Sequence, residues 1–293
     1  MCPPPSYLDG TGQPQEWIWL VPRGSSPAPN ALAELLGAVA SAPSVGVAGC
    51  KQLDGDGPER LIDVGLSVGR WGWGNRLTLI DDSEVDIGQY DGRSDTFGVS
   101  LSGMLIRRDI WDRLQGFDPA LPDVGADIDF CWRCRLAGSR VIVVPGAKIY
   151  RSDAREPYLD EIYEERRTEI YLRLKYSPTW SLPMHVIGAL GGGALKLTLS
   201  VFTMRARRGI AYLFGSFAAV AAFPSLLQSR EIAALTQRIP SSSIRKLKVP
   251  QREIRSHRPS RRSRGFMAPS EPVSHANEPE VQRASLLGPL KRR

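Results

Sequence analysis

The chain has 293 residues, of which 42% are hydrophobic, which is enough for one sizeable core and argues against disorder throughout. Its net charge of +7 is unevenly placed, because residues 245–293 hold thirteen Lys or Arg and four Glu, a net +9, which leaves −2 for residues 1–244. The basic charge therefore belongs to a tail, whose Pro, Ser and Arg content predicts disorder.

The cysteines exclude a disulfide framework, since only Cys131 and Cys134 of the four are close in sequence. This CxxC lies inside a helical pattern and no second pair completes a set of zinc ligands, so both are expected to be helix-face residues. Residues 1–15 are rich in Pro and lack the basic start and apolar core of a signal peptide. They predict a disordered N-terminus and a cytosolic, reducing setting.

The first elements alternate between strand and helix. "EWIWLV" (16–21) is a short aromatic and β-branched run ended by Pro22, which predicts a buried strand. The segment after it predicts a helix with Asn30 as N-cap and Pro43 beyond its end. One face of that helix carries Leu32, Leu35, Leu36 and Val39. "SVGVAGCKQL" (44–53) predicts the next strand.

The alternation continues through the middle of the chain. "TFGVSLSGMLIRR" (96–108) predicts a strand, which the short helical pattern "DIWDRLQG" follows. A further helix is expected to open at Asp127 and to close at Gly138, and the β-branched run 140–150 predicts another strand. Strands that alternate with helices predict an α/β layer architecture.

Beyond residue 155 the character of the chain changes. Residues 156–181 have the charged pattern of an amphipathic connecting helix, and residues 182–230 contain two apolar runs that approach the roughly 20 residues needed to span a bilayer. Arg205, Arg207 and Arg208 lie between these runs. A spanning hairpin would put the three arginines outside the cell, against the positive-inside tendency.

We therefore expect helices embedded in, or lying on, the inner leaflet of the membrane, with Arg and Lys side chains at anionic lipid headgroups. The alternative is that the two apolar runs are core helices of a soluble bundle. Residues 231–293 are expected to complete the chain as a basic disordered tail.

Asp127 and Asp129 stand two residues apart in "VGADIDFCWR" (124–133). Side chains at positions i and i+2 do not share a helical face, so if both act, one of them must lie in the loop or first turn before the helix. Free backbone amides favour acidic groups at such a helix start, so capping alone also explains the pair. The pair by itself is not specific enough to decide.

The surrounding residues "SLSGMLIRRDIWDRLQGFDPALPDVGADIDFCWRCRLAGSRVIVVPGAKIY" (100–150) closely resemble the acceptor-side half of family 2 glycosyltransferases with a GT-A fold, in particular large bacterial members with membrane segments. The resemblance covers about residues 16–155, and the later apolar runs look like the membrane-associated region of the same proteins. It implies an incomplete GT-A-like mixed sheet flanked by helices over residues 16–155.

The resemblance implies transfer of a sugar from a nucleoside diphosphate donor to a glycan or lipid-linked acceptor in cell-envelope polysaccharide synthesis, at the cytoplasmic face of a bacterial plasma membrane. In the family, an Asp at the position of Asp127 is the base that removes the acceptor proton, a task that suits an ionised carboxylate. Asp129 and Arg133 would orient this base and its helix. Ser102 and Gly103 would line the donor sugar.

Aromatic residues are also expected near a bound glycan, because aromatic faces suit sugar rings. The candidates are Trp132 and the loop from Trp71 to Trp73. Packing of these rings in a lid explains their presence at least equally well.

The metal site of the family is not preserved. Family members carry an Asp-x-Asp after the strand that matches "EWIWLV", where it holds Mg2+ or Mn2+ against the diphosphate. Here that segment reads "PRGSSPAP", without a carboxylate. Ala126 occupies the position before Asp127, where the family has an acidic residue. Arg151 occupies the position after the strand predicted over 140–150, where a metal-ligating His is common in the family. Because three positions are lost together, no cofactor is expected.

Only fifteen residues precede "EWIWLV", whereas the nucleotide-binding half of a GT-A domain needs several strand–helix units of about 30 residues each. This favours a truncated or degenerate transferase over a metal-independent enzyme in which Arg23 or Arg151 neutralises the diphosphate. The alternatives from other classes are a non-enzymatic membrane-bound scaffold and a glycan-binding remnant. No nucleic-acid partner is expected, because no recognition fold accompanies the basic run "RSHRPSRRSRG".

Overall fold

The structure is a computed structural model of the chain. It describes residues 15–55, 60–69, 76–78, 84–92, 94–121, 123–151, 159–203 and 206–247. The chain divides into two compact units, Met1–Arg258 and Pro259–Arg293, and the second lies wholly outside the described residues. The predictions for the N-terminus, for the loop from Trp71 to Trp73 and for most of the basic tail also fall outside them.

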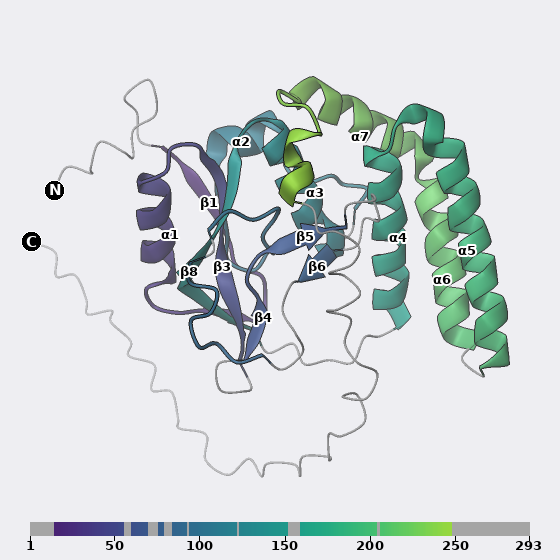
Figure 1. Ribbon diagram of the computed structural model, residues 1–293, viewed down its shortest axis with the longest axis horizontal. Coiled ribbons are helices and arrows are strands. Elements are labelled where there is room, and N and C mark those ends of the chain that lie inside the picture. The colour runs from purple at the N-terminus through teal and green to yellow at the C-terminus, as the bar shows by residue number, and fades with distance from the viewer. Residues whose placement is uncertain are drawn as a thin grey trace, which may run out of the picture. The chain divides into compact units, whose positions relative to one another are not determined.

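The central element of the first unit is a six-stranded mixed sheet (Figure 1). Five strands follow one another in the order β1-β7-β3-β8-β2, and β4 pairs with β3 beside them. Neighbouring strands run antiparallel except for β3 and β8, which are parallel. Their bounds are β1 Trp17–Leu20, β2 Ser25–Pro27, β3 Val45–Asp54, β4 Leu61–Asp63, β7 Met104–Arg107 and β8 Arg140–Arg151. A separate two-stranded sheet joins β5 Leu66–Val68 to β6 Arg76–Thr78.

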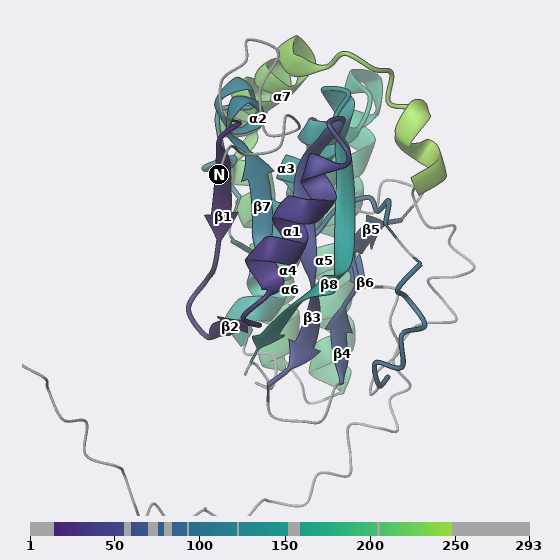
Figure 2. The ribbon, with the colours of Figure 1, turned by 90° about the vertical axis from the view of Figure 1, so that its left-hand side faces the viewer.

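Helices cover both faces of the six-stranded sheet. Figure 2 shows α1 in front of the sheet, with α3 on its far side. The helix bounds are α1 Ala31–Ala40, α2 Arg108–Arg113, α3 Asp123–Leu136, α4 Leu159–Tyr176, α5 Leu182–Phe202, α6 Ala206–Ala221 and α7 Phe223–Thr236. Short 3-10 helices occupy Thr179–Ser181 and Ser243–Leu247. The expected α/β class, with a mixed sheet flanked by helices, is confirmed.

The two faces of the sheet bury separate apolar clusters. Ala48 and Cys50 of β3 pack with Leu35 of α1 on one face, and Val47 packs with Phe130 of α3 on the other. All five side chains are at most 4% exposed. Burial of each large apolar side chain stabilises the fold by roughly 1.5–3 kcal/mol, so these contacts fix the sheet between its helices.

The two cysteines of the CxxC are helix residues, as predicted, and they lie on the face of α3 that packs on the sheet. The thiol of Cys131 donates to the carbonyl of Val99 at 3.8 Å, and a Cβ added at Gly46 would lie 2.9 Å from Cys134 Sγ. Burial raises the pKa of Cys134 to about 12. Its thiol therefore stays protonated and acts as a core side chain.

Three predicted boundaries differ from the observed ones. α3 begins at Asp123 and not at Asp127, so both aspartates of the predicted pair lie inside the helix. The strand predicted over 96–108 is limited to β7. The reason is Gly103, whose φ of +79° interrupts the extended backbone just before Met104.

The third difference concerns the tail that was expected from residue 231 onward. Residues 231–236 belong to α7, and Ser243–Leu247 form a 3-10 helix. Ile244 is 3% exposed, and the hydroxyl of Ser67 donates to the carbonyl of Leu247 at 2.9 Å. The chain therefore stays packed on the domain up to Leu247.

The apolar runs form helices beyond α4. In the part of the chain that the structure describes, one run, Thr179–Phe202, is long and apolar enough to cross a membrane, and 11% of its most apolar window is buried. α6 and α7 pass the same test together, although the chain bends by 60° between them. The predicted connecting helix corresponds to α4, which packs between α3 and the α5–α6 pair (Figure 1).

Candidate active site

Helix α3 runs antiparallel to β3, which places Asp127 toward the carboxyl end of that strand. Cys134, near the end of α3, lies against Gly46 at the start of β3. Cys131, one turn earlier, contacts Val99, which covers β3 further along the strand. Asp127 lies one more turn toward the start of the helix. The carboxyl ends of parallel strands are where open α/β sheets bind ligands, so Asp127 lies at the end of the sheet suited to a site.

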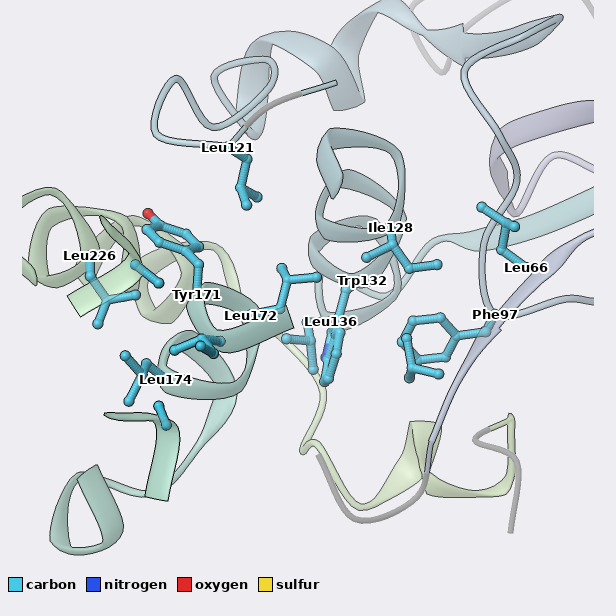
Figure 3. Close-up of a cluster of buried hydrophobic side chains, with 14 of the residues drawn as sticks. Leu66, Phe97, Leu121, Ile128, Trp132, Leu136, Tyr171, Leu172, Leu174 and Leu226 are labelled. Carbon is cyan, nitrogen blue, oxygen red and sulfur yellow. The ribbon is translucent and has the colours of Figure 1, made fainter. Parts of the chain in front are cut away.

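The side chain of Asp127 is 3% exposed. Its Oδ1 accepts a hydrogen bond from the backbone N–H of Ile128 at 2.7 Å. Ile128 itself packs toward Leu66 and Phe97 (Figure 3). The segment that begins at Phe97 leads directly to Ser102, so it connects the surroundings of Asp127 with the second predicted part of the site.

Ser102 and Gly103 form a tight turn that leads into β7 and lies beside the end of the neighbouring strand β1. The N–H of Gly103 donates to the carbonyl of Leu20 at 2.9 Å. A Cβ at Gly103 would lie 2.6 Å from Cys50 Sγ, and its φ of +79° disfavours any other residue. The turn holds Ser102 at 5% exposure, at the same end of the sheet as Asp127.

Four polar residues gather at this turn, and we call Ser25, Gln52, Ser102 and Arg151 the sheet-end cluster. The hydroxyls of Ser25 and Ser102 are 3.3 Å apart. The amide of Gln52 donates to the carbonyl of Ser102 at 3.4 Å and accepts at Oε1 from Arg151 Nη1 at 3.2 Å. Gln52 and Ser102 are buried, whereas Ser25 and Arg151 are half-buried. The cluster therefore presents a hydroxyl and a guanidinium in front of a buried amide.

Arg23, a predicted substrate residue, lies in the turn that enters this cluster. The N–H of Ser25 donates to the carbonyl of Pro22 at 3.2 Å, and Gly24 supplies the positive φ that the turn requires. The side chain of Arg23 is exposed. The fold thus brings Arg23 and Arg151 to the same end of the sheet as Ser102.

Asp129, the second predicted catalytic residue, belongs to a set that we call the buried charge network, made of Asp118, Asp129, Arg133 and Lys175. Arg133 Nε lies 2.8 Å from Asp129 Oδ2. Lys175 Nζ lies 2.7 Å from Asp129 Oδ1 and 2.8 Å from Asp118 Oδ2. All four residues are at most 8% exposed. Two negative and two positive charges compensate one another, as burial of charged groups demands.

The network ties α3 to its neighbours. Arg133 donates from Nη1 to the carbonyl of Leu114 at 2.7 Å and from Nη2 to that of Gly116 at 2.9 Å. The hydroxyl of Tyr176, at the end of α4, donates to Asp129 Oδ1 at 2.8 Å. Arg133 thus donates hydrogen bonds to other groups of the protein from Nε, Nη1 and Nη2. Its contact with substrate stays a prediction.

The network also controls the ionisation of its members. Burial alone would raise the pKa of Asp129, but the charges of Arg133 and Lys175 outweigh burial and lower it. The pKa of Asp118 is likewise lowered against burial, chiefly by Lys175. Burial, with Asp129, raises the pKa of Tyr176 well above its usual value, so its hydroxyl stays protonated. Asp129 is therefore a carboxylate with both oxygens paired to cations of the protein, which suits it to orient α3.

Sequence reasoning missed Asp118 and Lys175. Asp118 accepts hydrogen bonds from the hydroxyls of Tyr171, at 2.9 Å, and of Ser229. Its only local signal is its place in "GFDP", within the resembling stretch. Lys175 has none, because it is one charge among many on a helix whose pattern predicts a solvated face.

A cavity of about 420 Å³ lies between the loop after α2 and helix α7. Its walls include Phe117 of the loop, Asp118 and Arg133 of the buried charge network, and Gln228 of α7. The hydroxyl of Ser229 reaches Asp118 from α7. Helix α7 therefore forms one wall of this cavity, which borders the buried charge network.

Trp132 lies in the core and not at a surface. Its ring stacks on Tyr176 at 3.8 Å between centroids. It meets Phe97 edge-on at 5.1 Å (Figure 3). The residue is 3% exposed. These contacts leave no ring face for a glycan, so the predicted sugar contact does not fit the place of Trp132.

The residues at this end of the sheet do not fit a divalent cation. Asp127 and Asp54, the register partner of Arg151, are carboxylates at this end. The turn after β1, however, holds Arg23 and serines, Ala126 precedes Asp127, and Arg151 ends β8. Mg2+ and Mn2+ prefer carboxylate and other oxygen ligands. Within the described ranges, no group of three or more His, Cys, Asp or Glu side chains gathers that could hold a metal ion. No chemical step is therefore assigned to a metal.

Residues 10–171 match the family described as glycosyltransferase like family 2. The match covers more than half of the chain, and the chain belongs to this family. Among solved structures, the crystal structure of GalNAc-T7 with UDP, GalNAc and Mn2+ is similar at 13% identity and a TM-score of 0.39 over 73% of this chain. The match spans 42% of the length of that chain. No curated protein matches.

Proposed function

We propose that the chain transfers a sugar from a nucleoside diphosphate sugar to a hydroxyl of a glycan or lipid-linked acceptor in the synthesis of a bacterial cell-envelope polysaccharide. Membership of the family implies a nucleotide-sugar donor and an acceptor in general. The observation that carries the proposal is the place of Asp127, a carboxylate held on α3 toward the carboxyl end of the sheet. The sheet-end cluster lies at the same end.

Asp127 is assigned the role of general base. Its carboxylate accepts the proton of the acceptor hydroxyl while that oxygen bonds to the anomeric carbon of the donor sugar. The bond from this carbon to the diphosphate breaks, and its electron pair leaves with the diphosphate. Donors at the sheet-end cluster can stabilise the charge that develops there. Asp129 is assigned a positioning role, because Arg133 and Lys175 enclose its carboxylate.

The test follows release of nucleoside diphosphate from a panel of nucleoside diphosphate sugars, with oligosaccharide and lipid-linked acceptors. Asp127→Asn is expected to lower the rate by about 10²–10⁴-fold, the usual contribution of a general base. The control is Asp112→Asn, an exposed carboxylate on α2 that pairs with Arg108. Transfer by Asp127→Asn at the unaltered rate would contradict the assignment. No turnover by the unaltered chain would favour the glycan-binding remnant.

A second proposal concerns the α5–α6 pair, which we assign to the cytoplasmic face of the plasma membrane. Arg207 and Arg208 are exposed where α6 begins, and they suit anionic headgroups. The two helices approach closely, since a Cβ at Gly209 would lie 2.8 Å from the Cα of Leu197. Their outward side chains are large, apolar and more than half exposed: Ile187, Leu195, Leu199, Phe202, Phe214 and Phe217.

The contacts of α4 favour a pair that lies on the membrane over one that spans it. α5 has 21 residues and is about 31 Å long, enough for a crossing. Arg166 of α4, however, donates to Ser216 of α6 at 3.1 Å and lies 4.6 Å from the ring centroid of Tyr212. An upright α6 would carry this charged helix into hydrocarbon, at a cost of about 3 kcal/mol or more for each charge.

Flotation with vesicles tests this assignment. Phe214→Asp combined with Phe217→Asp is expected to abolish flotation with vesicles that contain phosphatidylglycerol, because two charges enter the apolar surface. Ile87→Asp is the matched control, since Ile87 is 83% exposed in a loop of the sheet domain. Flotation of the double variant at the level of this control would favour the alternative of a soluble bundle.

A further inference from the structure

We propose that the sheet-end cluster binds a diphosphate through Arg151, Ser25 and Ser102 without a divalent cation. This inference rests on the proposed function, because a diphosphate is the group that a nucleotide-sugar donor presents and leaves behind. It starts from the mismatch at this end of the sheet, where Asp54 and Asp127 belong to no described group of three or more metal-ligating side chains, and the chain adds guanidinium and hydroxyl groups.

The cluster is built in two layers. In the buried layer, the Gln52 amide accepts from Arg151 at 3.2 Å and donates to the carbonyl of Ser102 at 3.4 Å. In the accessible layer, Ser25 and Arg151 are register partners on β2 and β8, and the Ser25 hydroxyl lies 3.3 Å from that of Ser102. The buried amide therefore fixes the guanidinium beside two hydroxyls before any ligand arrives.

These groups match the chemistry of a diphosphate. A guanidinium presents a planar fork of N–H donors that can engage two phosphate oxygens at once, and hydroxyls can donate to further oxygens. Arg23 lies in the turn closed between Pro22 and Ser25, so a second arginine belongs to the segment that enters the cluster. Together the two arginines carry the same charge as one divalent cation.

Arg151 and Arg23 are expected to contribute unequally. Arg151 is half-buried and held by Gln52, so it loses little freedom when a ligand binds. Arg23 is exposed and must be ordered on binding. Asp54, the register partner of Arg151 on β3, adds a carboxylate at the same strand end. Its removal is therefore expected to strengthen the binding of an anion.

Isothermal titration of the full chain with inorganic pyrophosphate in EDTA tests the inference. Binding is expected without metal and is expected to weaken as salt is added. Arg151→Ala should weaken it at least about tenfold, as expected when a charge-assisted hydrogen bond is lost. The affinity of Arg151→Lys should lie between those of Arg151→Ala and the unaltered chain, because lysine keeps the charge and lacks the forked donors. Arg23→Ala should lower the affinity only a few-fold. Asp54→Asn should bind more tightly than the unaltered chain.

Arg140→Ala is the matched control, because Arg140 lies at the opposite end of β8, is 44% exposed and pairs with Asp95. Its binding of pyrophosphate is expected to equal that of the unaltered chain. Circular dichroism of each variant separates loss of binding from loss of fold, and Arg151→Lys keeps the inference testable if Arg151→Ala does not fold.

Three results would overturn the inference: no binding in EDTA, binding that requires manganese pyrophosphate, or equal affinities of Arg151→Ala and Arg140→Ala. Failure of the proposed function gives a different result. Full transfer activity in Asp127→Asn would remove the assigned base and leave metal-free binding of pyrophosphate unaffected.

Discussion

The buried charge network and the sheet-end cluster both hold an arginine in place, but they use its guanidinium differently. In the network, Arg133 is 4% exposed and donates to Asp129 and to two backbone carbonyls. In the cluster, Arg151 is half-buried, donates to the neutral side chain of Gln52 and has Asp54 as its register partner on β3. The first arginine is enclosed by the fold, whereas the second keeps exposed surface, and for this reason we assign the diphosphate to it. The partners and the exposure of an arginine, and not its residue type, therefore indicate whether it serves the fold or a site.

The largest expected effect comes from removing the cation at the centre of the network. Lys175→Met keeps the length of the side chain but leaves Asp118 and Asp129 buried with one positive charge fewer. The free energy of unfolding is expected to fall by about 3–5 kcal/mol, the usual cost of breaking a buried ion pair. Urea denaturation followed by circular dichroism measures the loss.

Lys148→Met is the matched control for this prediction. Lys148 lies 3.5 Å from Asp86, and its side chain is 35% exposed. Water still solvates this pair, so the expected change is about 1 kcal/mol or less. Similar losses in both variants would show that the network is not a special structural element.

Gly103→Ala addresses the turn that carries Ser102 in the sheet-end cluster. The new Cβ would lie 2.6 Å from Cys50 Sγ at a φ of +79°, and the expected loss of unfolding free energy is about 2–4 kcal/mol. Gly24→Ala is the control, because Gly24 has the same φ and no atom within 4 Å of the added Cβ. Its expected loss is about 1–2 kcal/mol, from the backbone alone. Thermal unfolding of both variants checks whether crowding makes the difference.

Acid is expected to act on the network, because Asp118 and Asp129 have pKa values below their ordinary value of 3.8. Groups with a lowered pKa in the folded state stabilise it fully above their unfolded pKa, and this stabilisation is lost as the pH falls through the folded pKa. Urea midpoints should therefore drop below about pH 4. Asp118→Asn should show a shallower drop than Asp112→Asn, and parallel curves would contradict the assignment.

The smallest expected effects separate the two regions at single hydroxyls. Ser229→Ala removes a donor to the buried carboxylate of Asp118, and the expected loss of unfolding free energy is about 1–2 kcal/mol. Ser25→Ala removes a half-buried hydroxyl with a 3.3 Å contact, and the expected loss is within about 0.5 kcal/mol. Ser25→Ala should weaken pyrophosphate binding, whereas Ser229→Ala should not. Weaker pyrophosphate binding by Ser229→Ala, with unaltered binding by Ser25→Ala, would contradict the roles assigned to the buried charge network and the sheet-end cluster.

Much of the secondary structure could be predicted from short stretches of sequence. β1, α1, β3 and β8 each follow from an apolar run that is bounded by turn-forming residues or by a cap. The order of the strands could not be predicted, because the pairing of Trp17 with Arg107 depends on packing between distant segments. The start of α3 was predicted four residues too late, because acidic residues occur at both 123 and 127 and either one suits the first turn of a helix.

The candidate site could be predicted only in part. Asp127, Ser102 and Arg23 come to one end of the sheet, as their places in the family pattern imply. Trp132 was expected at a glycan, but an aromatic residue carries no local mark of whether its ring faces solvent or core. The contacts of Lys175 with Asp118 and Asp129 join residues that are far apart in the chain, so no local pattern could predict them.

Helix α4 has consequences for how the molecule would be oriented in a cell. Its Arg166 contacts α6, and its Lys175 joins α3 through Asp129. A single helix of 18 residues therefore couples the apolar pair to the helix of Asp127. If the pair lies on a lipid surface as proposed, these contacts link the orientation of the sheet domain to that of the pair, and the bilayer would then set the direction from which an acceptor approaches.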